Sequence, residues 1–302
     1  TTGLSKGAQL SHSNIISNIM QCHAWIGNLF DHKGEIVITA LPLYHIFALT
    51  INCMLFYTTG AKNILVTNPR DMSGFLKILK KYPMNYITGV NTLYNGMLNH
   101  PEFKKLKFDQ LKLSVGGGMS IQKVVADKWK SITGVDLLEG YGLSETSPVA
   151  SFAPLGGKHK IGFIGIPVPD TDMAIFDDQQ NELPQGEHGE IGIKGPQVHQ
   201  GYWNVGEENK KCFTENGYFL TGDIGYMDED FFFKIIDRKK EMINVSGFNV
   251  YPNEVEKVIS EHPKVLEVGV TGVEDKKSSE LVAAFIVKKD PTLSADEIKL
   301  FC

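Results

Sequence analysis

The first seven residues, Thr1-Thr2-Gly3-Leu4-Ser5-Lys6-Gly7, concentrate hydroxyl groups, glycines and one lysine. A loop of this composition can turn tightly, present backbone N–H groups to an anion and add a cationic contact, as polyphosphate binding requires. It is not a Walker A loop, in which the lysine follows the second glycine and precedes Ser or Thr. Taken alone, the segment predicts an ordinary glycine turn more often than a phosphate site.

The same segment fits the G-x-S-x-G pattern of serine hydrolases, with Ser5 as the nucleophile. That pattern needs a helix directly after the serine. Residues 8–10 look extended instead, and none of the nine histidines is marked by its surroundings as the base for Ser5. The sequence therefore argues against a hydrolase.

A second polar segment, Glu139-Gly140-Tyr141-Gly142-Leu143-Ser144-Glu145-Thr146, follows an expected strand. Its glycines would let the backbone approach a ligand, and Tyr141 offers a flat face for stacking. Ser144 and Glu145 supply oxygen atoms to a phosphate-bound Mg²⁺, which is a hard cation. A strand-to-helix turn with a capping serine explains the segment equally well. The triple glycine 116–118, after another expected strand, would admit a planar base, but alone it is weak evidence.

A third pair of residues, Asp223 and Arg238, could bind a nucleotide sugar. We expect Gly222-Asp223 in a turn, where the carboxylate could accept hydrogen bonds from two ribose hydroxyls. Arg238 could reach the same sugar or a phosphate. Taken alone, Asp223 is more often an ordinary turn residue, and Arg238 is more often part of a solvated Arg-Lys-Lys run. Residues 228–230 resemble the start of a calcium loop but lack its later glycine and glutamate, so we expect a hairpin tip.

Composition limits the classes of function. The 302 residues suggest about two domains, and 42% hydrophobic residues suffice for a sizeable core. The 30 Lys and Arg against 35 Asp and Glu give a net charge of -5, which argues against a nucleic-acid partner. Four separated cysteines form no CxxC pair, so neither a disulfide framework nor a thiolate zinc site is indicated, and a reducing cytoplasm fits best.

The ends of the chain and its longest uncharged stretch bear on targeting. The chain begins with neither Met nor a secretory leader, and we expect it to start within a longer protein. Residues 36–61 contain no Asp, Glu, Lys or Arg, as a membrane span might. Pro42 and several polar residues interrupt this stretch, so we expect a strand (36–41), a loop and a buried helix (46–57) instead.

The elements that would position these segments alternate between helix and strand in the first half. Ser13 is expected to cap a helix with apolar positions at Ile15, Ile16, Ile19, Met20 and His23. Later elements are strands at 63–67, 86–90, 111–115 and 135–139 and helices at 71–82 and from about 121. This order predicts an α/β fold, with a mainly parallel sheet flanked by helices.

From residue 162 the pattern changes to short strands with Gly, Asp and Asn turns, which predict a small antiparallel sheet or distorted barrel. After the charged run 237–240, Pro252 suits the first turn of a helix, and two strands and a helix near Ser294 follow. We therefore predict three regions: 1–161 as part of a large α/β domain, 162–237 as a small β subdomain of the same domain, and 238–302 as a small α+β C-terminal domain.

Seven motifs occur in order along nearly the whole chain. They are TTGLSKGA (1–8), PLYH (42–45), GGG (116–118), EGYGLSET (139–146), GEIGIKGPQVHQGYW (189–203), TGDIG (221–225) and DRKKEMINVSGFNVYP (237–252). Together they resemble the adenylate-forming superfamily of acyl-CoA synthetases, luciferases and nonribosomal adenylation domains. Within it, the chain is most similar to bacterial long-chain fatty-acid-CoA ligases.

The resemblance implies an AMP-forming ligase. A fatty carboxylate would attack the α-phosphate of ATP, and the thiol of coenzyme A would then displace AMP. ATP, Mg²⁺ and coenzyme A are the implied cofactors and co-substrates, and fatty acid is the implied partner, in the cytoplasm. The resemblance leaves open contact with a membrane surface and the oligomeric state.

The resemblance also assigns roles, with Lys6, Ser144 and Glu145 as catalytic residues. The phosphates would lie at Thr1, Thr2, Gly3 and Lys6; adenine at Gly117, Glu139, Gly140 and Tyr141; the α-phosphate at Ser144; Mg²⁺ at Glu145; ribose at Asp223 and Arg238; and the coenzyme A arm at Gly247. Asp237 to Lys240 would be the hinge on which the C-terminal domain turns between half-reactions, and 43–56 part of the acyl-chain wall.

The chain departs from the superfamily at both ends. A stretch before the phosphate loop and the lysine that orients the carboxylate, which relatives place beyond Cys302, are missing. The resemblance therefore implies a truncated fragment that cannot complete adenylation alone. Two alternatives stay open: a sister ligase that loads a carrier protein or stops at acyl-adenylate, and a nucleotide- or acyl-binding module without turnover.

Overall fold

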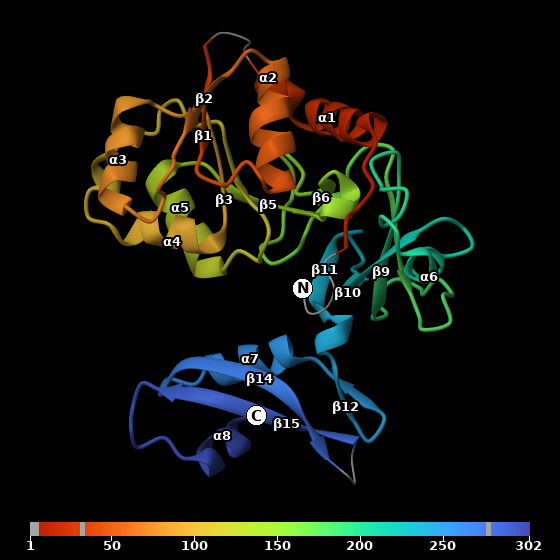
Figure 1. Cartoon of the computed structure of the whole chain (residues 1–302). Coiled ribbons are helices and arrows are strands. Elements are labelled where there is room, and N and C mark those ends of the chain that lie inside the picture. Colours follow the sequence, from red (N-terminus) through yellow and green to blue (C-terminus); the bar gives the residue numbers. More distant parts are fainter. Residues whose placement is uncertain (1–5, 31–33, 276–278) are drawn as a thin grey trace. The chain divides into compact units, whose positions relative to one another are not determined.

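The computed structural model describes residues 6–30, 34–275 and 279–302 (Figure 1). The chain divides into two units. Unit 1 comprises Thr1–Met173, Gly192–Phe219 and Asp228–Lys234, and unit 2 comprises Ala174–Ile191, Leu220–Met227 and Ile235–Cys302. The predicted phosphate-loop residues Thr1, Thr2 and Gly3 lie outside the described residues.

A seven-stranded sheet with the order β2-β1-β3-β4-β5-β6-β7 forms the centre of unit 1. The strands are β1 (Ile36–Thr39), β2 (Lys62–Leu65), β3 (Tyr86–Gly89), β4 (Leu113–Gly116), β5 (Leu137–Gly142), β6 (Val149–Phe152) and β7 (Ile166–Pro167). The pairs from β2 to β5 are parallel, and β6 and β7 join antiparallel. The predicted mainly parallel sheet is therefore confirmed.

Helices cover both faces of this sheet (Figure 1). Side chains alternate between the two faces along each strand, so neighbouring residues of one strand pack against different helices. Ile38 and Ile87 belong to one core with α3 (Met72–Lys81), α4 (Asn91–Asn99) and α5 (Lys123–Thr133). Their neighbours Val37 and Tyr86 belong to a second core with α1 (His12–Ile26), η2 (Ala48–Leu55) and α2 (Phe56–Thr58). Three short 3₁₀ turns complete unit 1: η1 (Gly27–Leu29), η3 (Phe103–Lys105) and η4 (Ser144–Thr146).

The uncharged stretch 36–61 contains β1, then η2 and α2, so the predicted strand and helix are confirmed. The helical part differs in kind, because η2 is a π-helix. No helix in the described part of the chain is both long enough and apolar enough to span a bilayer.

Helix α1 forms where expected, but it is capped differently and buries a different face. Its N-cap is Ser11, whose Oγ accepts the N–H of Asn14 at 3.1 Å, and not Ser13. Of the predicted apolar face, Ile16 is 55% and Met20 66% exposed. The buried side chains are Asn14, Asn18, Gln21, Cys22 and Ile26. The hydrophobic pattern therefore predicted the helix correctly and its buried face wrongly.

A second sheet contains β8 (Asp172–Phe176), β9 (Gly189–Lys194), β10 (Phe219–Met227) and β11 (Phe233–Arg238), in the order β11-β10-β9-β8. It is antiparallel, as expected, and the short helix α6 (Gly206–Lys211) precedes β10. Strand β10 was not predicted, and it places Asp223 within a strand and not in a turn. The expected hairpin tip is confirmed, because Asp228 Oδ1 accepts the N–H groups of Asp230 and Phe232, both at 3.0 Å.

The C-terminal region of unit 2 is the predicted small α+β structure. Its antiparallel sheet has the order β13-β12-β15-β14. The elements are η5 (Lys239–Glu241), β12 (Ile243–Val245), β13 (Phe248–Val250), α7 (Pro252–Ser260), β14 (Val265–Asp275), β15 (Ser279–Lys288) and α8 (Ala295–Phe301). Ile259 of α7 and Ile298 of α8 share a core with Val265 and Leu293. Pro252 begins α7 and Ser294 caps α8, as predicted.

The cap of α1 gives a test of the corrected helix start. Ser11→Ala removes the acceptor for a helix N–H, and we expect the free energy of unfolding to fall by about 1 kcal/mol. Ser13→Ala is the matched control, because Ser13 is exposed within the helix and the change should be within about 0.5 kcal/mol. Urea unfolding followed by circular dichroism measures both. Equal effects of the two substitutions would contradict the assigned cap.

Candidate functional site

The parallel pairing of β4 with β5 brings two of the predicted segments to one edge of the large sheet. Gly116 lies opposite Glu139 in the register. Parallel strands end at the same edge, so the glycines after β4 and the residues from Gly140 onward lie near each other. The triple glycine and the segment 139–146 are therefore neighbours in unit 1, as the chain's order alone could not show.

Glu139 is buried, and its carboxylate is used within the protein. Oε2 accepts the N–H of Ile121 at 3.1 Å, and Oε1 accepts the N–H of Gly162 at 2.6 Å. Burial raises the pKa of Glu139, and these two hydrogen bonds act in the opposite direction. The side chain thus joins the loop after β4 to the turn that precedes β7.

The glycines in this region are close to other parts of the chain. A Cβ atom at Gly142 would lie 1.9 Å from the carbonyl oxygen of Pro148, and one at Gly140 would lie 2.6 Å from the Phe152 ring. At Gly117 the nearest atom would be in the Phe47 ring at 3.0 Å. Packing within the protein therefore requires glycine at Gly142, where a Cβ would overlap the backbone, and opposes any larger residue at Gly140 and Gly117.

Ser144 and Glu145 lie in η4, directly after β5. Ser144 is exposed and Glu145 is half-buried. The Glu145 Oε1 atom accepts a hydrogen bond of 2.8 Å from the Tyr202 hydroxyl, and its carbonyl oxygen accepts the N–H of His199 at 2.8 Å. The predicted metal ligand is therefore held at both its side chain and its backbone.

Lys6 is exposed, and its Nζ lies 5.4 Å from the centroid of the Tyr202 ring. The backbone just after it pairs with the same segment, because Ala8 forms an isolated bridge with Tyr202 and Trp203 donates its N–H to Gly7 at 2.8 Å. The structure thus brings Lys6 and Glu145 to one tyrosine.

His199 supports this tyrosine from inside unit 1. It is 3% exposed, and its ring packs edge-on against Phe219 and Tyr202, with centroids 4.7 and 4.9 Å away. Nδ1 lies 2.9 Å from the Gly201 carbonyl, which only accepts, so Nδ1 carries the proton. Burial lowers the pKa of His199, which favours the neutral ring.

The sequence analysis assigned no role to His199 or Tyr202, although both lie in the quoted motif 189–203. The available signal was weak: a polar and aromatic segment, Gln-Val-His-Gln-Gly-Tyr-Trp, where a surface loop needs neither histidine nor tyrosine.

In unit 2, Asp223 and Arg238 are paired. Asp223 is 2% exposed, and its Oδ1 lies 2.8 Å from Arg238 Nε. The preceding Gly222 donates its N–H to Glu190 at 2.8 Å and has a φ of 75°, which favours glycine. A buried carboxylate needs such a partner, since an unpaired one is costly.

The predicted hinge residue Asp237 is also buried. Its carboxylate accepts the N–H of Arg238 at 2.8 Å and that of Asn253, in the first turn of α7, at 2.9 Å. A carboxylate at this end of a helix is favourable, because the helix N-terminus carries partial positive charge. Lys240, at the other end of the predicted hinge, lies in η5.

Gly247 lies in the two-residue turn between β12 and β13. Ser246 and Gly247 have φ values of 52° and 91°, and Val245 pairs with Phe248. Positive φ at both central residues is typical of a type I′ turn, which strongly favours glycine. The turn geometry by itself therefore accounts for Gly247.

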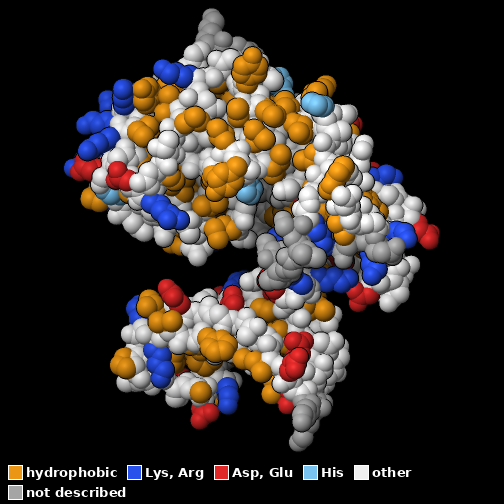
Figure 2. All heavy atoms as spheres, in the orientation of Figure 1, with side chains coloured by type: hydrophobic (Ala, Val, Ile, Leu, Met, Phe, Trp, Pro, Cys, Tyr) orange, Lys and Arg blue, Asp and Glu red, His pale blue; other side chains and the backbone are white. Residues whose placement is uncertain are grey.

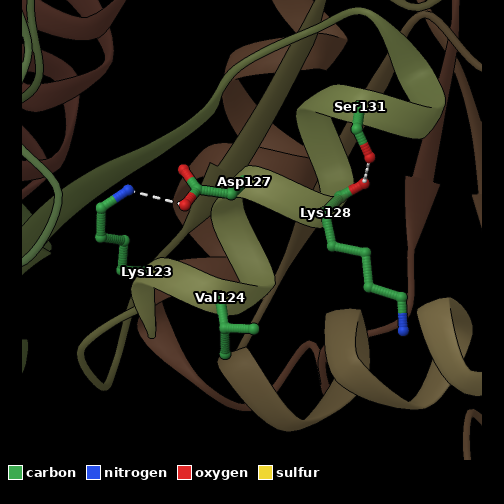
Figure 3. A pocket seen from close by; sticks show the side chains of 5 residues that line it. All are labelled: Lys123, Val124, Asp127, Lys128 and Ser131. Atoms are coloured by element: carbon green, nitrogen blue, oxygen red, sulfur yellow. Dashed lines mark hydrogen bonds and ion pairs between the residues drawn. The ribbon is translucent and has the colours of Figure 1, made fainter.

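A shallow pocket lies on the outer surface of α5, away from these segments in the chain. Figure 3 shows its lining residues, Lys123, Val124, Asp127, Lys128 and Ser131, with the Lys123–Asp127 ion pair at 2.6 Å. No predicted site residue is among them. The pocket is a surface hollow on one helix, and we assign it no part in the site.

The buried histidine yields a prediction about acid. A native pKa below the ordinary value means that the unfolded chain takes up the proton first as the pH falls. The contribution of His199 to the free energy of unfolding should therefore decrease as the pH falls through the ordinary histidine range.

Long-range ¹H–¹⁵N spectra of the histidine side chains measure this directly, with His199→Gln for assignment. We expect the neutral Nδ1–H form of His199 to persist below its ordinary pKa. A protonated His199 ring at pH 6.5 in the folded protein would contradict the geometry.

Comparison with known proteins identifies the family of the chain. Residues 1–203 match the AMP-binding enzyme family, and residues 254–302 match the AMP-binding enzyme C-terminal domain. The chain is 52% identical over its full length to the long-chain-fatty-acid–CoA ligase of Escherichia coli, but it spans only 54% of that protein.

Two solved structures are also similar. ATP-bound MatB from Rhodopseudomonas palustris has a TM-score of 0.88 and 31% identity, over 99% of this chain and 59% of that one. The o-succinylbenzoate coenzyme A synthetase MenE of Bacillus subtilis, with ATP and magnesium ion, has a TM-score of 0.84 and 29% identity, over 100% of this chain and 61% of that one. On the family match over most of its length, the chain belongs to the AMP-binding enzyme family.

Proposed function

We propose that the intact protein activates a long-chain fatty acid with ATP and transfers the acyl group to coenzyme A. The observation that carries the proposal is the Glu145 carboxylate held after β5 by Tyr202, which Lys6 also contacts, in a chain 52% identical to a long-chain-fatty-acid–CoA ligase. The chemistry requires activation, because a carboxylate is a poor electrophile and AMP is a far better leaving group than oxide. Positive charge near the phosphates would stabilise the transition state.

Glu145 is the proposed Mg²⁺ ligand. The described residues contain no cluster of three or more His, Cys, Asp or Glu side chains suited to a metal. A single carboxylate with the neighbouring Ser144 hydroxyl suits Mg²⁺, which binds one or two carboxylates together with substrate phosphates and water. When bound, Mg²⁺ would polarise the phosphoryl oxygens. Lys6, with Thr1, Thr2 and Gly3, would bind the departing phosphates, and Ser144 the α-phosphate.

Different residues are proposed for the base and for the sugar of the nucleoside. Gly117, Gly140 and Tyr141, with Glu139 supporting the loops, are the proposed adenine residues of unit 1. Asp223 and Arg238 are the proposed ribose residues of unit 2. Their ion pair fits this role, because Arg238 holds in place a carboxylate whose oxygen atoms can accept hydrogen bonds from hydroxyl groups.

The second half-reaction would use the C-terminal region 238–302, with Asp237 to Lys240 as the hinge and Gly247 beside the coenzyme A arm. Asp237 joins the end of β11 to the start of α7, so its hydrogen bond with Asn253 would have to break or turn with the C-terminal region during such a motion.

The acyl chain is expected along the uncharged stretch 43–56 of unit 1, which includes η2. Ala48, Ile51 and Leu55 of η2 are buried, and Phe47 lies against Gly117. A wall of this kind suits an apolar chain, since binding would remove hydrocarbon from water.

Cytoplasmic location, with contact to a membrane surface, is a further proposal. Lysines are exposed on α3 and η3, and Figure 2 shows Lys and Arg side chains gathered at this end of unit 1. The residues are Lys77, Lys80, Lys81, Lys104 and Lys105. Anionic lipid attracts such groups by about 1 kcal/mol each.

Two other functions remain as alternatives. A sister ligase would load a carrier-protein thiol or stop at acyl-adenylate, and thioester formation with free coenzyme A would count against it. A binding module would take up AMP without turnover, which calorimetry with AMP on this chain would detect. The chain alone spans about half of its curated relatives, so turnover is tested on the intact protein.

The first test is the product formed across fatty acids of increasing length. We expect AMP and pyrophosphate in amounts that depend on fatty acid, ATP and Mg²⁺, with the highest rates for long chains. Pyrophosphate release and nucleotide chromatography measure this. ADP in place of AMP, or equal rates without fatty acid, would contradict the proposal.

The second test is Glu145→Ala in the intact protein. Loss of the metal ligand should lower pyrophosphate release about 100-fold or more, because charge stabilisation in the transition state is lost. Glu215→Ala changes an exposed glutamate of the same unit and is the control. Near-normal release by Glu145→Ala, with an unchanged circular dichroism spectrum, would remove the metal assignment.

A further inference from the structure

We propose that Tyr202 is a positioning residue that fixes the carboxylate of Glu145 for the metal-bound nucleotide. The inference rests on the proposed function of Glu145 and extends it to a residue outside the predicted site. Its first support is the hydrogen bond of 2.8 Å from the Tyr202 hydroxyl to Glu145 Oε1. Bonds to an ionised carboxylate are about twice as strong as those between neutral groups.

The backbone that carries Tyr202 is itself fixed at both sides. His199 donates its N–H to the carbonyl of Glu145 at 2.8 Å, and Gln9 donates its N–H to the carbonyl of Gly201 at 2.9 Å. The segment 199–203 therefore lies between the residues that follow Lys6 and the loop that carries Glu145. Its position sets the distance between the two.

The Tyr202 ring makes a second contact, with the positively charged ammonium group of Lys6. Lys6 Nζ lies 5.4 Å from the ring centroid, within the range of a cation–π interaction. One side chain thus holds a carboxylate through its hydroxyl and contacts an ammonium group through its face. The two charged groups thus contact different parts of the same side chain.

The surroundings keep Tyr202 from moving. The buried ring of His199 packs against it, and Asn14 of α1 donates from Nδ2 to the carbonyls of Pro196 and Val198 at 2.7 and 2.9 Å. A positioning residue must itself be fixed, since a mobile one would only share the disorder of its partner.

Loss of the hydroxyl has a specific consequence. In Tyr202→Phe the ring keeps its packing and its contact with Lys6, but the Glu145 carboxylate is no longer held. Metal binding would then have to order the Glu145 side chain. The rotamer entropy lost in that step would lower the affinity for the metal. The variant should therefore need more Mg²⁺, while the rate at saturating Mg²⁺ changes little.

The test is a Mg²⁺ titration of pyrophosphate release by the intact protein at saturating ATP and fatty acid. For Tyr202→Phe we expect the half-saturating Mg²⁺ concentration to rise about tenfold, with the limiting rate within about threefold. Tyr218→Phe is the matched control, because Tyr218 is in the same unit and its ring also lies near a lysine, Lys194, at 5.6 Å. An unchanged half-saturating concentration for Tyr202→Phe would overturn the proposal.

A second measurement does not depend on turnover. Binding of Mn²⁺ together with ATP, followed by electron paramagnetic resonance, should weaken about tenfold in Tyr202→Phe, but Tyr202→Phe should weaken it no further when it is added to Glu145→Gln. Additive losses would overturn the positioning role. If the unchanged protein released no pyrophosphate with fatty acid but Tyr202→Phe still weakened Mn²⁺ binding, the fatty-acid assignment would fail and the positioning role would stand.

Discussion

The parallel pairing of β4 with β5 is the constraint on which the candidate residues of unit 1 depend. It places the ends of both strands at one edge of the sheet, with Gly116 opposite Glu139. Segments separated by more than 20 residues then become neighbours. The strand pairing fixes where each loop begins, and buried Glu139 joins the loop after β4 to the turn before β7 through the N–H groups of Ile121 and Gly162. The loops at this edge are therefore positioned by sheet hydrogen bonds and by one buried carboxylate.

Buried charge is handled by the same physical rule in both units. Asp223 is paired with Arg238, Asp237 accepts two backbone N–H groups, and Glu139 does likewise. Each carboxylate is buried only where partners replace the water it has lost. Ile121 and Gly162 bond Glu139, and Asn253 bonds Asp237, from distant segments, so these two acids also help to position a loop or helix. Charge satisfaction and loop placement are thus one feature of this fold.

Much of the fold could be predicted from the sequence, because strands such as 86–90 and helices such as 71–82 carry strong local patterns. The strand β10 was missed, since Thr-Gly-Asp reads as a turn when only neighbours along the chain are considered. The quoted motifs included Glu145 and Tyr202, but their contact joins residues 57 positions apart. Its existence depends on the fold of 199–203, which no local pattern records.

Helix α1 shows why hydrophobic periodicity alone misplaced a face. Three amides, Asn14, Asn18 and Gln21, occupy the buried side. Asn18 accepts the N–H of Val149 and donates to its carbonyl. Asn14 donates to the carbonyls of Pro196 and Val198. Pro196 and Val198 lie in the irregular segment after β9, whereas Val149 is the first residue of β6, and buried N–H and carbonyl groups must be satisfied in both places. Amide side chains carry both a donor and an acceptor. A polar helix face can therefore lie in the interior where its side chains form hydrogen bonds with buried backbone groups.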